Sequence, residues 1–253
     1  MDTSGRPPEL SWLPPNLVVL YEPRDGQRRG PRPAMSLAAV IEAGVAIADA
    51  EGLAGVSMAK VAERLGYTTM SLYRYVRNKD ELLLLMANSA NAEPPPAPIP
   101  GSWRDGLESW AAAIFGLYRR HRWLLQVPIS GPPAGPAQLM WMEAGLANLA
   151  ELDLHDGIKL QIIQLLHGYA RGEAQLSNDL DSLDPAANTA QRYGQILRAV
   201  TTPETHPALG RLLASGVLDA PTEYDEEMDL GFGLRTILDG VARLVDSMTT
   251  PQV

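Results

Sequence analysis

Residues 55–86 read GVSMAKVAERLGYTTMSLYRYVRNKDELLLLM, and this stretch decides the fold. Its apolar residues recur every three or four positions, which is the spacing of an amphipathic helix with one buried face. Ser57 begins one such pattern and Gly66 ends it, because serine caps helix N-termini and glycine terminates helices. A tight turn separates this pattern from a second, shorter one. The stretch therefore predicts two helices joined as a helix-turn-helix.

The shorter helix carries a group of polar and aromatic residues on its outer side. We expect Thr68 or Thr69 to cap it, and Leu72 and Val76 to point into the core. The residues expected to face outward are Ser71, Tyr73, Arg74 and Tyr75. Such a helix presents its N-terminal side chains to base edges in a DNA major groove. An ordinary three-helix packing unit is the alternative, but packing does not require aromatics and hydroxyls on an exposed edge.

Two further helices flank this pair. Residues 36–52 show helical spacing, with Ser36 as the N-cap and Gly52 as the stop. Asn78 and Glu81 fit an N-cap and its reciprocal partner at the third helical position, so they begin a helix that runs to residue 92. The first 86 residues therefore hold a compact set of short helices.

Helical spacing also dominates the rest of the chain. Proline recurs through residues 93–101 and predicts a connection there. Beyond it the predicted helices span residues 103–117, 137–152, 158–176, 187–199 and 230–248. A weak strand pattern at residues 17–21 is the one departure. The predicted fold class is all-α, with an N-terminal three-helix helix-turn-helix domain and a larger C-terminal helical domain for ligand binding and dimerisation.

The predicted domain organisation has three parts. Residues 1–35 are rich in proline, glycine and arginine and predict a flexible basic arm. Residues 36–82 form the helix-turn-helix domain, and residues 83–253 form the ligand-binding and dimerisation domain. The helix 158–176 is apolar on two faces and the helix 230–248 carries a broad apolar stripe, so we expect both to form a four-helix bundle with their copies in a homodimer.

The charge of the chain is unevenly distributed. The net charge is -9, yet residues 1–80 carry 10 Lys or Arg against 9 Asp or Glu, while residues 81–253 carry 11 against 21. Two basic patches, at residues 24–32 and 57–79, suit phosphates. In the first patch Arg28, Arg29 and Arg32 are candidates for contacts in a DNA minor groove, and a merely solubilising arm is the alternative.

The composition excludes several classes of function. The chain has no cysteine, which rules out disulfides and thiolate chemistry and favours a reducing cytoplasm. No stretch approaches the roughly 18 apolar residues of a membrane span, and residues 10–21 do not form a signal peptide. The four histidines lack metal-ligand spacing, and no phosphate-binding glycine loop or nucleophile elbow occurs, so we expect neither catalysis nor a cofactor or metal.

Residues 36–86, and above all the run quoted above, closely resemble the DNA-binding domain of the TetR family of bacterial regulators. The shared features are the LGY turn, the SLYRYV recognition helix and the NKDELL start of the next helix. The resemblance implies that Thr69, Ser71, Tyr73, Arg74 and Tyr75 face the groove of double-stranded operator DNA. It also implies that Ser57, Thr68 and Lys79 face phosphates.

The C-terminal part resembles, more weakly, the tetracycline-repressor type of ligand domain. The similarity lies in GSWRDGLESWAAAIFGLYRRHRWLL, SGPP and HGYARGEA. Where that repressor coordinates a metal-drug complex, the matching positions are Ala92 and Pro128, so we do not expect a magnesium–tetracycline complex. The resemblance implies a repressor that a small, largely apolar molecule releases from its operator. A helical protein-interaction adaptor without operator binding is the alternative.

An effector cavity needs apolar walls and a few orienting polar groups. The candidates are Trp110, Ile114, Met140, Trp141, His167, Tyr169 and Arg171. Ordinary core packing is the alternative for each of them. We expect an effector to shift the helix at residues 78–92 and thereby to change the separation of the two recognition helices in the dimer.

Overall fold

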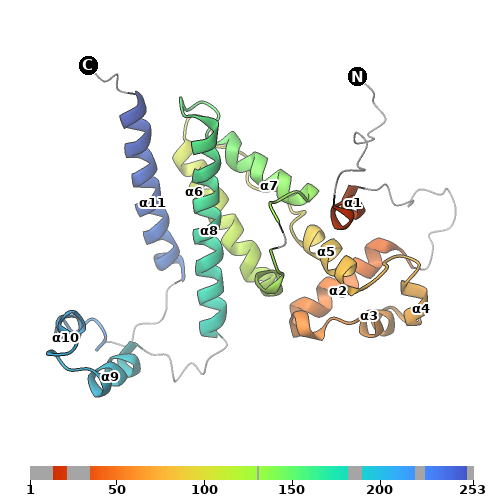
Figure 1. Cartoon of the computed structure of the whole chain (residues 1–253), viewed down its shortest axis with the longest axis horizontal. Helices are drawn as coiled ribbons and strands as arrows, with labels where there is room; N and C mark the ends of the chain where they lie inside the picture. Colours follow the sequence, from red (N-terminus) through yellow and green to blue (C-terminus); the bar gives the residue numbers. More distant parts are fainter. Residues whose placement is uncertain (1–13, 22–34, 130, 182–189, 220–225, 250–253) are drawn as a thin grey trace.

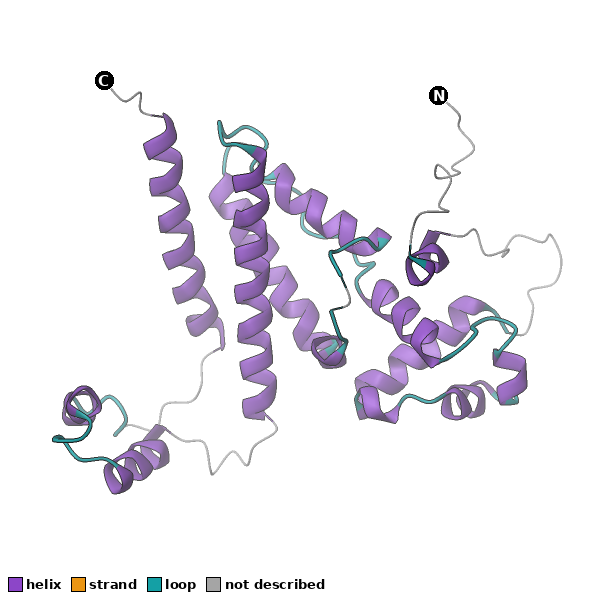
Figure 2. Cartoon of the chain, in the orientation of Figure 1, coloured by secondary structure: helices purple, strands orange, loops and turns teal. Residues whose placement is uncertain are grey.

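The computed structural model describes residues 14–21, 35–129, 131–181, 190–219 and 226–249. Within these ranges every regular element is a helix, as predicted, and Figure 2 shows helices joined by loops. No helix of these ranges is long and apolar enough to cross a membrane.

The N-terminal unit contains α2 (Leu37–Glu51), the 3-10 turn η2 (Leu53–Gly55), α3 (Met58–Leu65), α4 (Thr69–Leu72) and α5 (Lys79–Ala90). Three of its four predicted side-chain caps are confirmed, whereas Thr68 stands at the N-cap of α4 without a capping hydrogen bond from its side chain. The hydroxyl of Ser36 accepts a hydrogen bond from the backbone of Ala39 at 3.1 Å, and that of Ser57 accepts one from Lys60 at 3.2 Å. Oδ1 of Asn78 accepts one from the next helix at 2.8 Å. These local bonds start α2, α3 and α5 where the sequence places them.

The reciprocal half of the cap on α5 differs from the prediction. The carboxylate of Glu81 accepts a hydrogen bond from the backbone N–H of Arg77 at 3.1 Å, whereas the sequence predicts the N–H of Asn78 as the donor. The Arg77 N–H lies one residue outside the helix and has no helical acceptor, so the carboxylate satisfies it there.

The C-terminal unit is a bundle of long helices (Figure 1). It contains α6 (Trp103–Arg120), the 3-10 segment η3 (Arg122–Gln126), α7 (Pro136–Ala147), α8 (Asp156–Asp181) and α11 (Glu226–Thr249). Helix α8 lies against α6, α7 and α11 and is therefore the central helix of the bundle. The structure makes α7 shorter than predicted, because the chain turns at residues 148–152 after Asn148.

Two short helices, α9 (Ala190–Val200) and α10 (Pro207–Ala214), pair with each other beside the bundle (Figure 1). A guanidinium nitrogen of Arg198 on α9 donates to the carbonyl of Leu213 on α10 at 3.3 Å. The sequence analysis missed α10, because eight residues that begin with proline form too short a pattern to separate from a loop.

The segment predicted as a weak strand is instead the helix α1 (Pro15–Tyr21). Pro15 provides the backbone angle of a first helical turn, and packing then outweighs the strand preference of the two valines. Val19 is 6% exposed, and α1 lies against α5 (Figure 1). The expectation of a flexible arm is therefore wrong for residues 15–21.

One buried core runs from the N-terminal unit into the bundle. It includes Leu72 and Met86 on the N-terminal side, and Trp123 and Leu166 on the other. Helix α5 extends across the boundary predicted between residues 82 and 83. Because α5 contributes residues to both units, a displacement of α5 moves residues of both.

Candidate operator-binding surface and effector site

Helix α4 is held against the core along one edge. Leu72 is fully buried and Val76 is 1% exposed, as the sequence predicts. Gly66 ends α3 with φ 76° and ψ 27°, a left-handed conformation that glycine adopts without strain. This sharp turn places α4 across α3. Because one edge of α4 is buried, its opposite edge faces solvent.

The opposite edge of α4 lies in solvent. Tyr73, the C-cap of α4, is 48% exposed, and Arg74 in the turn that follows is also exposed. Lys79 is exposed in the first turn of α5, as expected of a phosphate contact. A guanidinium, an ammonium and a phenol on one surface provide donors that suit phosphate oxygens and the acceptors on base edges.

The predicted hydroxyl contacts lie close to this edge. Oγ1 of Thr68 and Oγ of Ser71 are 3.1 Å apart and share a hydrogen bond, which leaves each oxygen with further bonding capacity. Thr69 and Ser71 are half-buried, and Thr68 is exposed. Ser57 is exposed while its hydroxyl caps α3. These side chains border the solvent edge and do not protrude from it.

Tyr75 does not face outward, and the expectation that it does is wrong. Its side chain is half-buried against the core, and its hydroxyl donates to the backbone carbonyl of Met35 at 2.9 Å. This partner lies 40 residues earlier in the chain. Tyr75 therefore joins the start of the DNA-binding unit to the end of the recognition segment. The predicted arm residues Arg28, Arg29 and Arg32 lie outside the described residues.

The sequence analysis missed one prominent residue of this surface. Met70 is 76% exposed, more than Tyr73 on the same edge. An apolar residue in a helical pattern is ordinarily assigned to the core. The exposure of Met70 was therefore not predicted from its residue type. Helical spacing could have predicted this exposure, because Leu72 and Val76 already form the buried edge and Met70 is not on the same face as they are.

The two tryptophans predicted for the effector site are core residues with satisfied indoles. Trp110 on α6 is 2% exposed and donates from Nε1 to the carbonyl of Trp141 at 2.9 Å. Trp141 on α7 is 8% exposed and donates to the carbonyl of Asn91 at 2.9 Å. Ile114 is buried beside them in the same core cluster, and Met140 is partly buried against it. The indoles join α6 to α7 and α7 to the end of α5.

A polar cluster of three residues lies between α6 and α8. Tyr118 on α6 and Nε2 of His167 on α8 are 3.2 Å apart, and their rings meet edge to face. Arg171, one turn further along α8, donates to the carbonyl of Leu125 at 2.9 Å. The sequence analysis named His167 and Arg171 but not Tyr118. Its phenol is recognisable only from the tertiary structure, because 49 residues separate it from His167.

Burial and the arginine set the charge states of this cluster. Burial, with a smaller contribution from the positive charge of Arg171, lowers the pKa of His167 below its ordinary value. Burial raises the pKa of Tyr118, although Arg171 opposes that shift. At neutral pH the imidazole and the phenol are therefore uncharged and Arg171 is the one cation of the three. The cluster offers directional hydrogen bonds next to a single positive charge.

Tyr169 faces a different neighbour. Its hydroxyl donates to the carbonyl of Leu230 at 3.3 Å, so it joins α8 to α11. A Cβ atom built on Gly233 of α11 would lie 2.1 Å from the same hydroxyl. Tyr169 is therefore part of the contact between these two helices, and the structure does not bring it together with Trp110 or Trp141. Among the described residues no group of three or more acidic or histidine side chains is arranged to hold a metal ion.

Comparisons with known proteins show the family of this chain. The family profile described as "Bacterial regulatory proteins, tetR family" matches residues 40–86, and the profile described as "Tetracyclin repressor-like, C-terminal domain" matches residues 95–245. The chain belongs to the TetR family. It is thus a DNA-binding transcriptional regulator with a tetracycline-repressor-type C-terminal domain.

Individual TetR-family proteins resemble the chain over most of its length. The HTH-type transcriptional repressor DrrR1 of Streptomyces coeruleorubidus is 39% identical over 237 residues, which are 90% of this chain and 85% of that protein. The structure of apo ActR from Streptomyces coelicolor superposes with a TM-score of 0.71 at 25% identity, covering 86% of this chain and 99% of ActR. ActR in complex with actinorhodin gives 0.70 at 26% identity, covering 82% and 95%.

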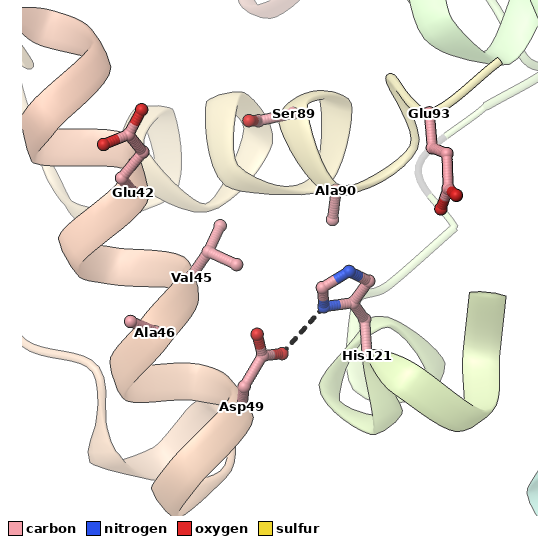
Figure 3. A pocket seen from close by; sticks show the side chains of 8 residues that line it. All are labelled: Glu42, Val45, Ala46, Asp49, Ser89, Ala90, Glu93 and His121. Carbon is pink, nitrogen blue, oxygen red and sulfur yellow. Dashed lines mark hydrogen bonds and ion pairs between the residues drawn. The ribbon is translucent and has the colours of Figure 1, made fainter.

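In this TetR-family chain the two units meet at Asp49, near the end of α2. Its Oδ1 atom accepts hydrogen bonds from Nδ1 of His121 at 2.8 Å and from Nε1 of Trp123 at 2.7 Å. Figure 3 shows Asp49 and His121 at the border of a hollow of about 340 Å³ between α2, α5 and η3. The sequence analysis did not predict this junction, because its donors and acceptor lie more than 70 residues apart.

Other bonds connect this junction to the bundle. Arg119 and Arg122, on either side of His121, reach the carboxylate of Asp181 at the end of α8 at 2.9 and 2.6 Å. Burial acts to raise the pKa of Asp181, but the two arginines outweigh it and lower the pKa below its ordinary value. Because Arg171 also binds the Leu125 carbonyl, α8 holds η3 at both ends. A movement of α8 is therefore passed to η3 and to Asp49.

Proposed function

We propose that this TetR-family chain is a homodimeric repressor in which Tyr73, Arg74 and Lys79 contact operator DNA. The observation that carries the proposal is that one edge of the recognition segment is buried and the opposite edge is exposed. Leu72 anchors one edge of the helix, while the phenol and guanidinium of the other edge lie in solvent. A helix so held enters a major groove without rearrangement of its supporting helices. Because its partner is chromosomal DNA, we place the protein in the cytoplasm.

The homodimer is proposed to form through α8 and α11. These two helices pack against each other in one chain, yet each keeps several exposed apolar side chains. The exposed side chains are Leu160, Leu165 and Leu176 on α8, and Phe232, Leu244 and Met248 on α11. A second copy that covers these side chains completes a four-helix bundle by a two-fold axis. The exposed apolar side chains of α11 are not the ones expected from the apolar stripe predicted for residues 230–248. Leu234 and Leu238, which belong to that stripe, are buried inside the chain.

The effector is proposed to bind between α6, α7 and α8, next to the cluster of Tyr118, His167 and Arg171. ActR, which shares the fold, forms crystalline complexes with actinorhodin and with (S)-DNPA. Trp110 and Ile114 provide apolar surface on the adjoining face of α6. A largely apolar molecule with an acidic or hydroxyl group suits this combination, because the cluster supplies one cation and two uncharged partners.

Release from the operator is proposed to pass through α5 and η3. The effector displaces α6 or α8, and α5 follows because the carbonyl of Asn91 at its end is bonded to Trp141. Asn88 on α5 also accepts a hydrogen bond from the backbone of Ala137 on α7 at 3.2 Å. Since two recognition helices must stay about 34–36 Å apart to occupy successive major grooves, a small shift of α5 misaligns one of them.

A binding-selection experiment tests the DNA contacts. The full chain selects duplexes from a random pool, and fluorescence anisotropy then measures the affinity of the selected duplex at fixed salt. We expect Tyr73→Ala and Arg74→Ala each to weaken binding by about tenfold, in keeping with roughly 1–3 kcal/mol for a lost base contact. Arg211→Ala on α10 is the matched control, because it removes an exposed arginine outside the DNA-binding unit. Equal affinities for all four proteins would refute the assignment.

Light scattering tests the dimer. The wild-type chain should have twice the mass of the 27.4 kDa protomer. Leu165→Glu on α8 buries a charge in the proposed interface and should yield monomers. Ile129→Glu changes a side chain that is 76% exposed outside both helices and should leave the mass unchanged. A dimeric Leu165→Glu protein would exclude α8 from the interface.

A further inference from the structure

Met70 is the most exposed large apolar side chain of the DNA-binding unit within residues 35–91. It is 76% exposed, while Tyr67 and Tyr73, three residues to either side, are 36% and 48% exposed. Met70 and Tyr73 are three residues apart in helical backbone, so they share the outer edge of α4 and its C-cap. Tyr67 lies before Thr68, whose backbone is extended, and is therefore outside this helical edge.

The fold does not require methionine at this position. The buried edge of α4 is supplied by Leu72 and Val76, and Met70 lies on the other side. A polar residue there would cost nothing in packing and would remove an apolar contact with water. Single exposed apolar side chains are common on protein surfaces. The exposure of Met70 gains its meaning from its position, because it lies beside the exposed Tyr73 and Arg74 of the proposed DNA-contacting edge.

Base edges in the major groove present one apolar group, the C5-methyl of thymine. Arg74 and Lys79 beside Met70 supply the positive charge that draws this surface to duplex DNA. The thioether of methionine is flexible and polarisable, so it adapts to a methyl group at the floor of a groove. Cytosine, which has hydrogen at C5, offers no such contact.

We propose that Met70 is a specificity-determining residue that packs on a thymine C5-methyl in each operator half-site. This inference rests on the proposed function, since it needs α4 in the major groove. It adds a preference that the hydrogen-bonding residues do not provide. Arg74 distinguishes bases by their acceptors, whereas Met70 distinguishes thymine from cytosine and from uracil by one methyl group.

The experiment removes that methyl from the DNA and the side chain from the protein. The probe is the duplex selected from a random pool by the full wild-type chain, with each thymine of one half-site replaced in turn by uracil. At one position we expect the wild-type affinity to fall about fourfold, the effect of one methyl group withdrawn from an apolar contact. For Met70→Ala the same replacement should leave the affinity unchanged.

Matched variants separate a methyl contact from a general loss of binding. Met70→Leu should remain sensitive to the methyl, while Met70→Gln, which has a similar length but a polar end, should not. Tyr73→Ala binds more weakly but should keep the full methyl effect, because its target is a different group. The melting temperatures of the Met70 variants should match that of the wild type, since the side chain is exposed.

Two results would overturn the inference. The wild-type chain would bind every uracil-containing duplex as tightly as the parent duplex, or Met70→Ala would retain the whole methyl effect at each position. Either result leaves operator binding intact and refutes only the assignment of Met70. Failure to select any duplex would refute the proposed function, and with it this inference.

Discussion

Oδ1 of Asp49, on helix α2 of the N-terminal unit, lies 2.7 Å from Nε1 of Trp123 in the C-terminal unit. The same oxygen accepts a hydrogen bond from His121. Trp123 is 1% exposed, so the carboxylate of Asp49 is the acceptor that satisfies its buried indole N–H. One oxygen atom therefore holds Trp123 of η3 and His121, the residue before η3, against α2.

Removal of this carboxylate should destabilise the chain. Asp49→Ala leaves the buried indole N–H without an acceptor and should lower the free energy of unfolding by about 1–3 kcal/mol in urea denaturation. Asp49→Asn should cost less, because an amide oxygen still accepts one bond. Glu51→Ala on the same helix breaks only the exposed pair with Lys60 and should cost at most about 1 kcal/mol. An Asp49→Ala protein as stable as Glu51→Ala would contradict this account of the junction.

Two glycines of α6 should respond to alanine in opposite directions. A Cβ at position 106 would lie 1.8 Å from Oδ1 of the buried Asn148, so Gly106→Ala should lower the melting temperature by several degrees. At Gly116 the nearest atom would be 3.7 Å away, on the flexible side chain of Arg120, and alanine should stabilise the helix by up to about 1 kcal/mol.

The cause of the first effect can be isolated in the same experiment. Oδ1 of Asn148 has no hydrogen-bond partner among the described residues, so Asn148→Ala removes the clashing atom without breaking a bond to it. The double variant of residues 106 and 148 should recover much of the loss. A double variant that melts no higher than Gly106→Ala would show that another contact is responsible.

The helix α1 should depend on the hydroxyl of Tyr21. That hydroxyl donates to the carbonyl of Ala134 at 2.5 Å, in the loop before α7. Tyr21→Phe should lower the free energy of unfolding by about 1 kcal/mol and speed amide hydrogen exchange in α1 and around residue 134. The comparison is Tyr193→Phe on α9, where the ring is 55% exposed. Equal exchange rates in α1 for the two variants would exclude a role for this bond.

The burial of His167 predicts a dependence of stability on pH. Its pKa is lowered in the folded protein, so below its ordinary value of 6.5 the unfolded chain binds more protons than the folded one. Stability should therefore be complete at about pH 8 and fall as the pH drops through 6.5 toward 5. His167→Gln should reduce the fall in melting temperature, whereas His206→Gln, at an exposed histidine, should retain it. Identical pH profiles for the three proteins would contradict this.

Local patterns in the sequence were enough to predict most of the helices. The caps of α2, α3 and α5 each join residues three apart, so both partners of each hydrogen bond lie within one short stretch of sequence. The buried edge of α4 follows from its spacing in the same way. The TetR-family resemblance adds the prediction that five residues face a DNA groove. Of these five, Tyr73 and Arg74 are exposed, Thr69 and Ser71 are half-buried, and Tyr75 points its hydroxyl to the carbonyl of Met35.

The features that the sequence did not predict depend on partners far along the chain. Tyr75 binds a carbonyl 40 residues away, Tyr21 one 113 residues away, and Trp123 a carboxylate 74 residues away. Helical periodicity reports only which residues share a face, because side chains within one helix interact at short separations. Which face meets which neighbour is decided when the helices pack. The sequence by itself thus determined most of the helices and the helix-turn-helix segment, and the tertiary structure alone decided how the two units are joined and that Met70 faces outward.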